Sequence, residues 1–113
     1  MSKLSMSGSG DIHTLANLIC HELNESALSC ELVDSVDRTV GDTRIMIMVF
    51  EKYYMRSSNY ASLTVVICEE NGQISVDAIG SAGGQSPFLK MSWGAERDFV
   101  AAVENILLRQ GFR

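Results

Sequence analysis

The chain has 113 residues and a mass of 12.4 kDa, about the size of one domain. Hydrophobic residues make up 46% and charged residues 20%, a balance that excludes a disordered chain and favours a folded one. The net charge of −5 argues against a nucleic-acid-binding protein that works through bulk positive charge. We therefore expect a single domain over residues 1–113 that binds no nucleic acid.

Neither a targeting segment nor a disulfide framework is indicated. Residues 1–10 are small and polar, and they lack the apolar stretch of a signal peptide. The longest apolar run, residues 45–50, is far shorter than the ~20 residues of a spanning helix. Cys20, Cys30 and Cys68 are odd in number and widely spaced, which favours reduced thiols. We expect a cytoplasmic protein with no membrane segment.

The first elements are a strand and a helix. Alternation over residues 2–7 predicts a short strand, and Asp11 stands where a helix N-cap is expected. The apolar residues that follow recur every three or four positions, which predicts an amphipathic helix ending near Asn24. These residues are Ile12, Leu15, Ala16, Ile19 and Leu23.

Period-two patterns then predict four strands joined by short turns. The first runs from Leu28 to Val40, and Gly41-Asp42 turns the chain into a second strand from Thr43 to about Met55. Residues 62–68 and 74–78 alternate on either side of Asn71-Gly72, whose residue types suit a type I′ hairpin turn.

The strand from Thr43 to Met55 is apolar on both faces, which is typical of a central strand. We assign the face of Ile45, Ile47 and Val49 to the helices and expect it to continue into Leu63, Val65 and Ile67. On this assignment one core residue comes from the middle of each main element. That predicted core is Ile19, Leu32, Ile47, Val65, Val76, Val103 and Ile106.

The C-terminal third begins with an irregular stretch over residues 80–87, and residues 88–93 are a candidate extra strand. A second helix is expected from Ser92 or Gly94, and Gly111 ends it as the residue after the C-cap. The predicted fold is α+β: an antiparallel β-meander of four to six strands with two helices packed on one face, in the order β-α-β-β-β-β-α.

This element order resembles the TATA-binding-protein-like and helix-grip folds. The segment Ser92 to Phe99 (SWGAERDF) is similar to small uncharacterised bacterial domains of unknown function. The resemblance implies a curved antiparallel sheet around a long C-terminal helix, and it implies no activity and no site residue.

Catalytic and metal-binding patterns are absent from the sequence. His13 and His21 are eight residues apart, too far around and along a helix to hold one metal, and we expect both on its polar face. The cysteines lack a CxxC spacing, and no nucleophile–base pair stands out. We therefore expect no catalytic residue, no metal and no cofactor, and we do not expect an enzyme.

Two surfaces are candidates for binding. The Gly-rich stretch with Gly83, Gly84 and Gln85 is either a plain connection or a ligand-binding loop, although the Lys-Ser/Thr of a phosphate loop is missing. Trp93 either clamps the start of the last helix or stacks on a ligand.

The second candidate is the face of the central strand away from the helices, where Met46, Met48 and Phe50 lie beside Val66. Such a patch is buried by curling of the sheet or by the segment Phe88 to Trp93, or it is an interface of a homodimer or another protein, or it lines a ligand cavity. The favoured function is a structural or interaction module that self-associates through this face. The alternative is a small-molecule-binding domain with a cavity between the sheet and the C-terminal helix.

Overall fold

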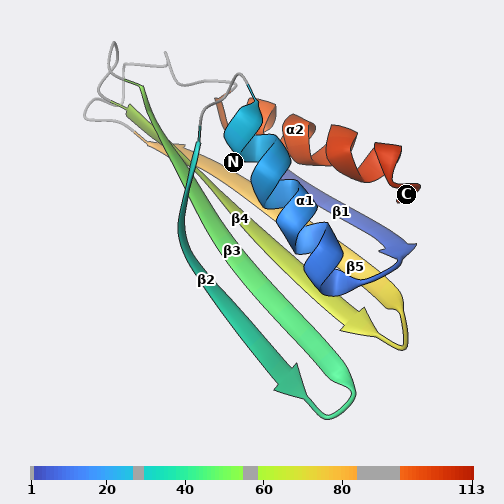
Figure 1. Ribbon diagram of the computed structural model, residues 1–113. Coiled ribbons are helices and arrows are strands. Elements are labelled where there is room, and N and C mark those ends of the chain that lie inside the picture. The colour runs from blue at the N-terminus through green and yellow to red at the C-terminus, as the bar shows by residue number, and fades with distance from the viewer. Residues whose placement is uncertain (1, 27–29, 55–58, 84–94) are drawn as a thin grey trace.

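One five-stranded antiparallel sheet carries both helices in the computed structural model (Figure 1), which describes residues 2–26, 30–54, 59–83 and 95–113. The elements are β1 (Ser2–Ser9), α1 (Ile12–Glu25), β2 (Glu31–Val40), β3 (Thr43–Tyr54), β4 (Asn59–Glu70), β5 (Gln73–Gly83) and α2 (Ala95–Arg109). The strand order across the sheet is β1-β5-β4-β3-β2. The predicted α+β class and the order β-α-β-β-β-β-α are confirmed.

The local signals at the ends of elements behave as expected. The Asp11 carboxylate accepts hydrogen bonds from the backbone N–H and the hydroxyl of Thr14, each at 2.9 Å, and so caps α1. Asn71 and Gly72 have φ of 54° and 80°, the positive values that a type I′ turn requires between β4 and β5. Gly111, which follows α2, has φ of 85°.

Both helices lie on the same side of the sheet (Figure 1), and the side they cover carries Met48. Met48 lies opposite Val65 on β4, and Val65 lies opposite Ala78 on β5; all three are buried. The prediction that the helices cover the Ile45, Ile47 and Val49 face is therefore wrong. Tyr54 pairs with Asn59, so even-numbered residues of β3 share a face with odd-numbered residues of β4.

The predicted core is confirmed at five of its seven positions. Leu32 and Ile47 are the exceptions. Leu32 is 46% exposed on β2, and Ile47 is half-buried on the uncovered face. The five confirmed core residues are Ile19, Val65, Val76, Val103 and Ile106.

The β2–β3 hairpin extends away from the helices (Figure 1). Helix α1 contacts β3 and β4, while α2 contacts β1, β4 and β5. All ten residues of β2 are exposed. The sheet therefore has a covered part centred on β4 and β5 and an open outer strand.

The C-terminal third differs from expectation at one point. Strand β5 continues to Gly83, which pairs with Tyr60, so residues 80–83 are strand and not an irregular stretch. The candidate extra strand over residues 88–93 lies outside the described residues. Within the described ranges, no helix is long and apolar enough to cross a membrane.

Candidate interaction surface

The Met/Phe patch expected from the sequence is not a surface. Met48 and Phe50 are each 2% exposed, and Met46 packs against the same core beneath the helices. The Sγ atom of Cys20 on α1 lies 3.4 Å from the Sδ atom of Met48. Val66 lies on the opposite face, where it pairs with Ile47. These four predicted interface residues are therefore divided between two faces.

The centre of the uncovered face is apolar on one half only. Its central row runs across the sheet from Val36 through Ile47 and Val66 to Asp77 and Ser5. The first three positions are apolar and belong to β2, β3 and β4. The last two are polar and bonded to each other, because the Ser5 hydroxyl donates to the Asp77 carboxylate. The apolar half of this row therefore lies on the β2 side of the sheet.

In the two neighbouring rows, a charged residue on β2 takes the place of Val36. Arg38 begins a row with Ile45 and Cys68, and Asp34 begins a row with Val49 and Thr64. We call the aliphatic residues that these three rows place on β2, β3 and β4 the open apolar surface. They are Val36 on β2, Ile45, Ile47 and Val49 on β3, and Val66 on β4.

The two edges of the sheet differ. At the β1 edge, the Ser7 backbone N–H donates to the Arg113 carbonyl at 2.8 Å, and the Arg113 N–H donates back to Ser7 at 2.9 Å. The chain end thus occupies part of that edge. At the other edge, β2 exposes four large apolar side chains, Leu32, Val33, Val36 and Val40. A long exposed edge with apolar side chains is a template for pairing with another strand.

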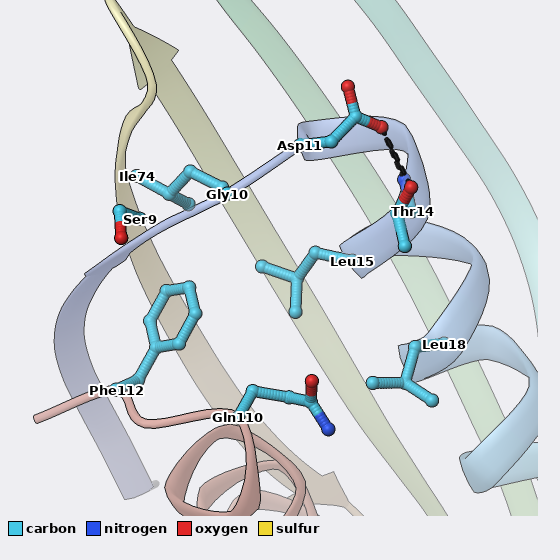
Figure 2. A pocket seen from close by; sticks show the side chains of 9 residues that line it. All are labelled: Ser9, Gly10, Asp11, Thr14, Leu15, Leu18, Ile74, Gln110 and Phe112. Atoms are coloured by element: carbon cyan, nitrogen blue, oxygen red, sulfur yellow. Dashed lines mark hydrogen bonds between the residues drawn. The ribbon is translucent and has the colours of Figure 1, made fainter.

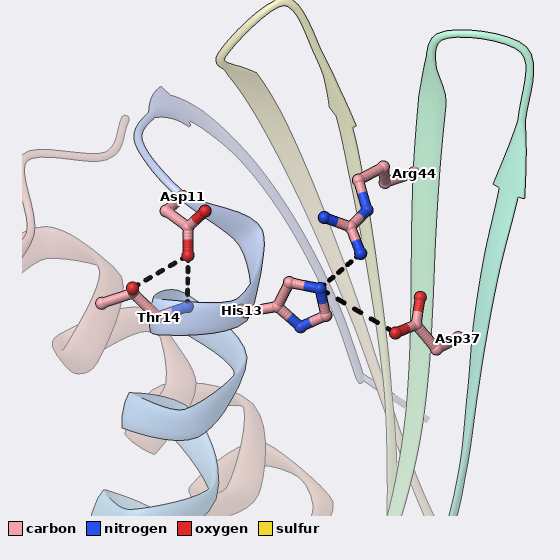
Figure 3. Close-up of polar contacts among 5 residues, drawn as sticks. All are labelled: Asp11, His13, Thr14, Asp37 and Arg44. Atoms are coloured by element: carbon pink, nitrogen blue, oxygen red, sulfur yellow. Dashed lines mark hydrogen bonds and ion pairs between the residues drawn. The ribbon is translucent and has the colours of Figure 1, made fainter.

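A polar cluster connects the start of α1 with the β2–β3 hairpin (Figure 3). The Arg44 guanidinium donates to Nε2 of His13, and the Asp37 carboxylate lies 4.0 Å from the same nitrogen. His13 is thus half-buried against the hairpin and not simply a solvated residue of the polar face, whereas His21 is exposed. The cluster holds β2 and β3 relative to α1 at a point where no helix covers β2.

Asp11, at the same end of α1, has a pKa below its ordinary value. The main cause is the hydrogen bond from the Thr14 backbone N–H, followed by the bond from the Thr14 hydroxyl. His13 and Arg44 add smaller electrostatic contributions in the same direction. The Asp11 carboxylate is therefore committed to capping the helix.

A small pocket of about 170 Å³ opens between the start of α1, the end of β1 and the segment after α2 (Figure 2). Leu15, Ile74 and Phe112 supply apolar walls, and Asp11 and Gln110 supply polar groups at its rim. Ligand pockets for drug-sized molecules are typically about 300–1,000 Å³. This pocket is therefore large enough for only a few heavy atoms.

Of the other predicted binding residues, only Gly83 is among the described residues. Gly83 is the last residue of β5, and Gly84, Gln85 and Trp93 lie outside the described residues. Among residues 2–26, 30–54, 59–83 and 95–113, no three His, Cys, Asp or Glu side chains come together as a metal site.

The three cysteines are free thiols, with Cys30 buried and Cys20 and Cys68 half-buried. Burial raises the pKa of both Cys20 and Cys30. Both thiols are therefore held in the neutral form, which is the less nucleophilic one.

Comparison with known proteins leaves the function open. The model of a family of unknown function, DUF6054, matches residues 1–111. No curated protein matches the chain. Among solved structures, the protein TTHA0849 from Thermus thermophilus matches with a TM-score of 0.36 and 9% identity, over 96% of this chain and 97% of that chain.

Proposed function

The chain belongs to the DUF6054 family of unknown function, and we propose that it is an interaction module that self-associates on the β2 side of its sheet. The exposed β2 edge is the observation that carries this proposal. Every residue from Glu31 to Val40 is exposed, and the open apolar surface begins at this strand and extends to β4.

Two physical contributions favour a second protein strand at this edge. An unpaired edge strand presents a row of backbone N–H and C=O groups that another strand can satisfy. The apolar side chains beside it lose water when a neighbour packs along them, at about 25 cal/mol per Å² of buried apolar surface. The half of the same face that carries Ser5 and Asp77 is more polar, and the chain end occupies part of the β1 edge beside it.

Ligand binding is the second candidate, and the pocket at Leu15 and Phe112 is the observation behind it. Its volume of about 170 Å³ falls below the range typical of ligand sites, although a larger hollow of about 490 Å³ lies along Thr43, Cys68 and Ser75. The exposed apolar side chains on β2 line neither hollow. We therefore favour self-association.

The experiment is a measurement of molar mass in solution by light scattering for the wild type and two matched variants. Val36 is 41% exposed on β2, and Ile79 is 37% exposed on β5, both on the uncovered face. Val36→Lys places a charge at the open edge, while Ile79→Lys places the same charge further into the sheet. We expect a wild-type mass above 12.4 kDa, a monomeric Val36→Lys variant and an Ile79→Lys variant that resembles the wild type.

Three results would contradict the proposal. A wild type that stays monomeric at millimolar concentration would remove self-association altogether. Equal effects of the two lysines on the molar mass would show that the interface is not on the β2 side. Persistence of the wild-type mass in Val36→Lys, with an unchanged circular dichroism spectrum, would exclude the β2 edge.

A further inference from the structure

We infer that two copies of the chain pair their β2 strands antiparallel in one register, with Val36 opposite the Val36 of the second copy. This inference rests on the proposed self-association and specifies its partner and geometry. Strand β2 is the outer strand of the sheet (Figure 1), and pairing it with a second β2 continues the sheet across both molecules.

Symmetry limits the registers that are available. Two identical edges that pair antiparallel are related by a two-fold axis, so each contact occurs twice. Facing residues must lie on the same side of the continued sheet, and alternate residues of a strand point to opposite sides. The axis therefore passes midway between the two copies of one β2 residue, and the choice of that residue fixes all the other pairs.

The charges of β2 distinguish among the central choices. With Asp34, Asp37 or Arg38 at the axis, a charged side chain faces its own copy, which is destabilising. With Ser35 at the axis, Asp34 faces Val36 and no charged pair forms. Only with Val36 at the axis does Asp34 face the second copy's Arg38. By symmetry that opposite-charge pair then forms a second time.

Both charged side chains are available for this role. Asp34 and Arg38 are exposed and lie on the same face as Val36, one on each side of it. Within the described residues, neither side chain takes part in an ion pair, and the Asp34 carboxylate accepts only from the neighbouring Ser35 backbone N–H at 2.8 Å. The monomer thus leaves two opposite charges unpaired at the spacing that a second copy needs.

The apolar row of the uncovered face is continuous in this register. Val66, Ile47 and Val36 lie side by side on adjacent strands, which are about 4.8 Å apart. The second copy adds its own Val36, Ile47 and Val66 in reverse order. The β-bulge between Leu32 and Asp34 lies at the border of this stretch and limits regular pairing to the part of β2 that follows it.

Edge charges commonly discourage strand pairing. On β2 their signs would instead favour one central register over the others, because Asp34 and Arg38 repel their own copies and attract each other. The charge pattern therefore disfavours irregular aggregation and favours one dimer.

Charge reversal tests the register. Asp34→Arg gives two Arg–Arg contacts in the homodimer, and Arg38→Asp gives two Asp–Asp contacts. Each single variant should raise the dimer dissociation constant about tenfold or more. The double variant D34R/R38D restores opposite charges and should return to within about threefold of the wild type. Glu104→Arg, an exposed residue of α2 with the same charge change as Asp34→Arg, is the matched control and should leave the constant unchanged.

Mixing the two single variants gives the sharper readout. Native mass spectrometry of equimolar Asp34→Arg and Arg38→Asp should show predominantly the heterodimer. Both of its charged contacts are between opposite charges, whereas each homodimer has two contacts between like charges. A statistical mixture of homodimers and heterodimers would overturn the register and leave self-association intact. A monomeric wild type would instead overturn the proposed function and this inference together. Circular dichroism of each variant establishes that the charge change has not unfolded it.

Discussion

The thiol sulfur of Cys20 on α1 lies 3.4 Å from the thioether sulfur of Met48 on β3. This contact identifies the face of the central strand that the helices cover. Met48 is 2% exposed, while its neighbour Ile47 points to the uncovered face beside Val36. Two adjacent residues of similar size therefore belong to different environments, and substitutions at these positions should have opposite outcomes.

The first prediction compares a glutamate at each of these positions. Met48→Glu should destabilise the fold by more than about 3 kcal/mol, because an unpaired carboxylate would be buried under α1. Ile47→Glu should remain folded, because its carboxylate can reach water on the uncovered face. Urea denaturation followed by circular dichroism measures both. If the two variants had the same midpoint, the assignment of faces would be wrong.

The second prediction concerns the packing of α2. Ile106 is buried against the sheet, and truncating it to Ala should lower the free energy of unfolding by ~2–5 kcal/mol because a cavity is left. Leu108, two residues later, is exposed, and Leu108→Ala should stay within about 0.5 kcal/mol of the wild type. Chemical denaturation of the pair gives the difference, and a similar loss for both would contradict the position of the helix face.

A third prediction follows from the close approach of β1 to the chain end. A Cβ atom on Gly8 would lie 2.7 Å from three ring atoms of Phe112, which is buried. Gly8→Ala should therefore cost about 1–3 kcal/mol through overpacking. In a Phe112→Leu background the same substitution should cost clearly less, since the ring is gone. Additive losses in this double-mutant cycle would show that the ring does not limit the space at Gly8.

The fourth prediction is a pH dependence at the start of α1. The pKa of Asp11 is lowered in the folded state, first by the Thr14 backbone hydrogen bond. The stabilising contribution of the ionised Asp11 carboxylate is therefore present above the unfolded-state pKa. It is lost as the pH falls through the lowered folded-state pKa. Asp11→Asn keeps a capping oxygen but does not titrate.

The expected result is that the melting temperature of the wild type falls more steeply than that of Asp11→Asn between about pH 4 and pH 2. Asp11→Ala should melt below both near neutral pH, because it lacks any side-chain acceptor. Parallel curves for wild type and Asp11→Asn would mean that this carboxylate is not the titrating cap.

Several parts of this architecture could be predicted because local chemistry determines them. Asp11 marks the start of α1, Asn71-Gly72 determines a hairpin turn, and Gly111 follows the last helix. Each of these is decided within a few residues by backbone preference or by one capping side chain. The antiparallel order of the strands followed from the short turns between them.

The covered face of β3 could not be predicted, because the hydrophobic pattern of this strand does not distinguish its two faces. Ile47 and Met48 are both apolar, so alternation does not say which of them lies under the helices. The choice depends on where the connection between β3 and β4 closes, which pairs Tyr54 with Asn59. A shift of one residue would exchange the two faces completely. The predicted interface therefore included Met48 and Phe50, which are core, and of the row from Val36 through Ile47 to Val66 it contained only Val66.

The exposure of β2 could not be predicted from the sequence either. Leu32 and Val36 suggested a half-buried strand, but β2 is at the edge of the sheet and the helices do not cover it. Its charges give a signal that could have been found: Asp34 and Arg38 flank Val36 symmetrically on one face. That pattern indicates a pairing register only once β2 is known to be an open edge.

Pairing at the β2 edge is tested most directly by hydrogen exchange of the backbone amides of Glu31–Val40, measured at several protein concentrations. In an isolated molecule, the amides of β2 that point away from β3 have no strand to bond and should exchange rapidly. We predict that their protection increases with concentration, while the amides of β4 and β5 stay equally protected throughout. Rapid exchange of the outward β2 amides at every concentration, in a sample whose mass shows a dimer, would contradict it.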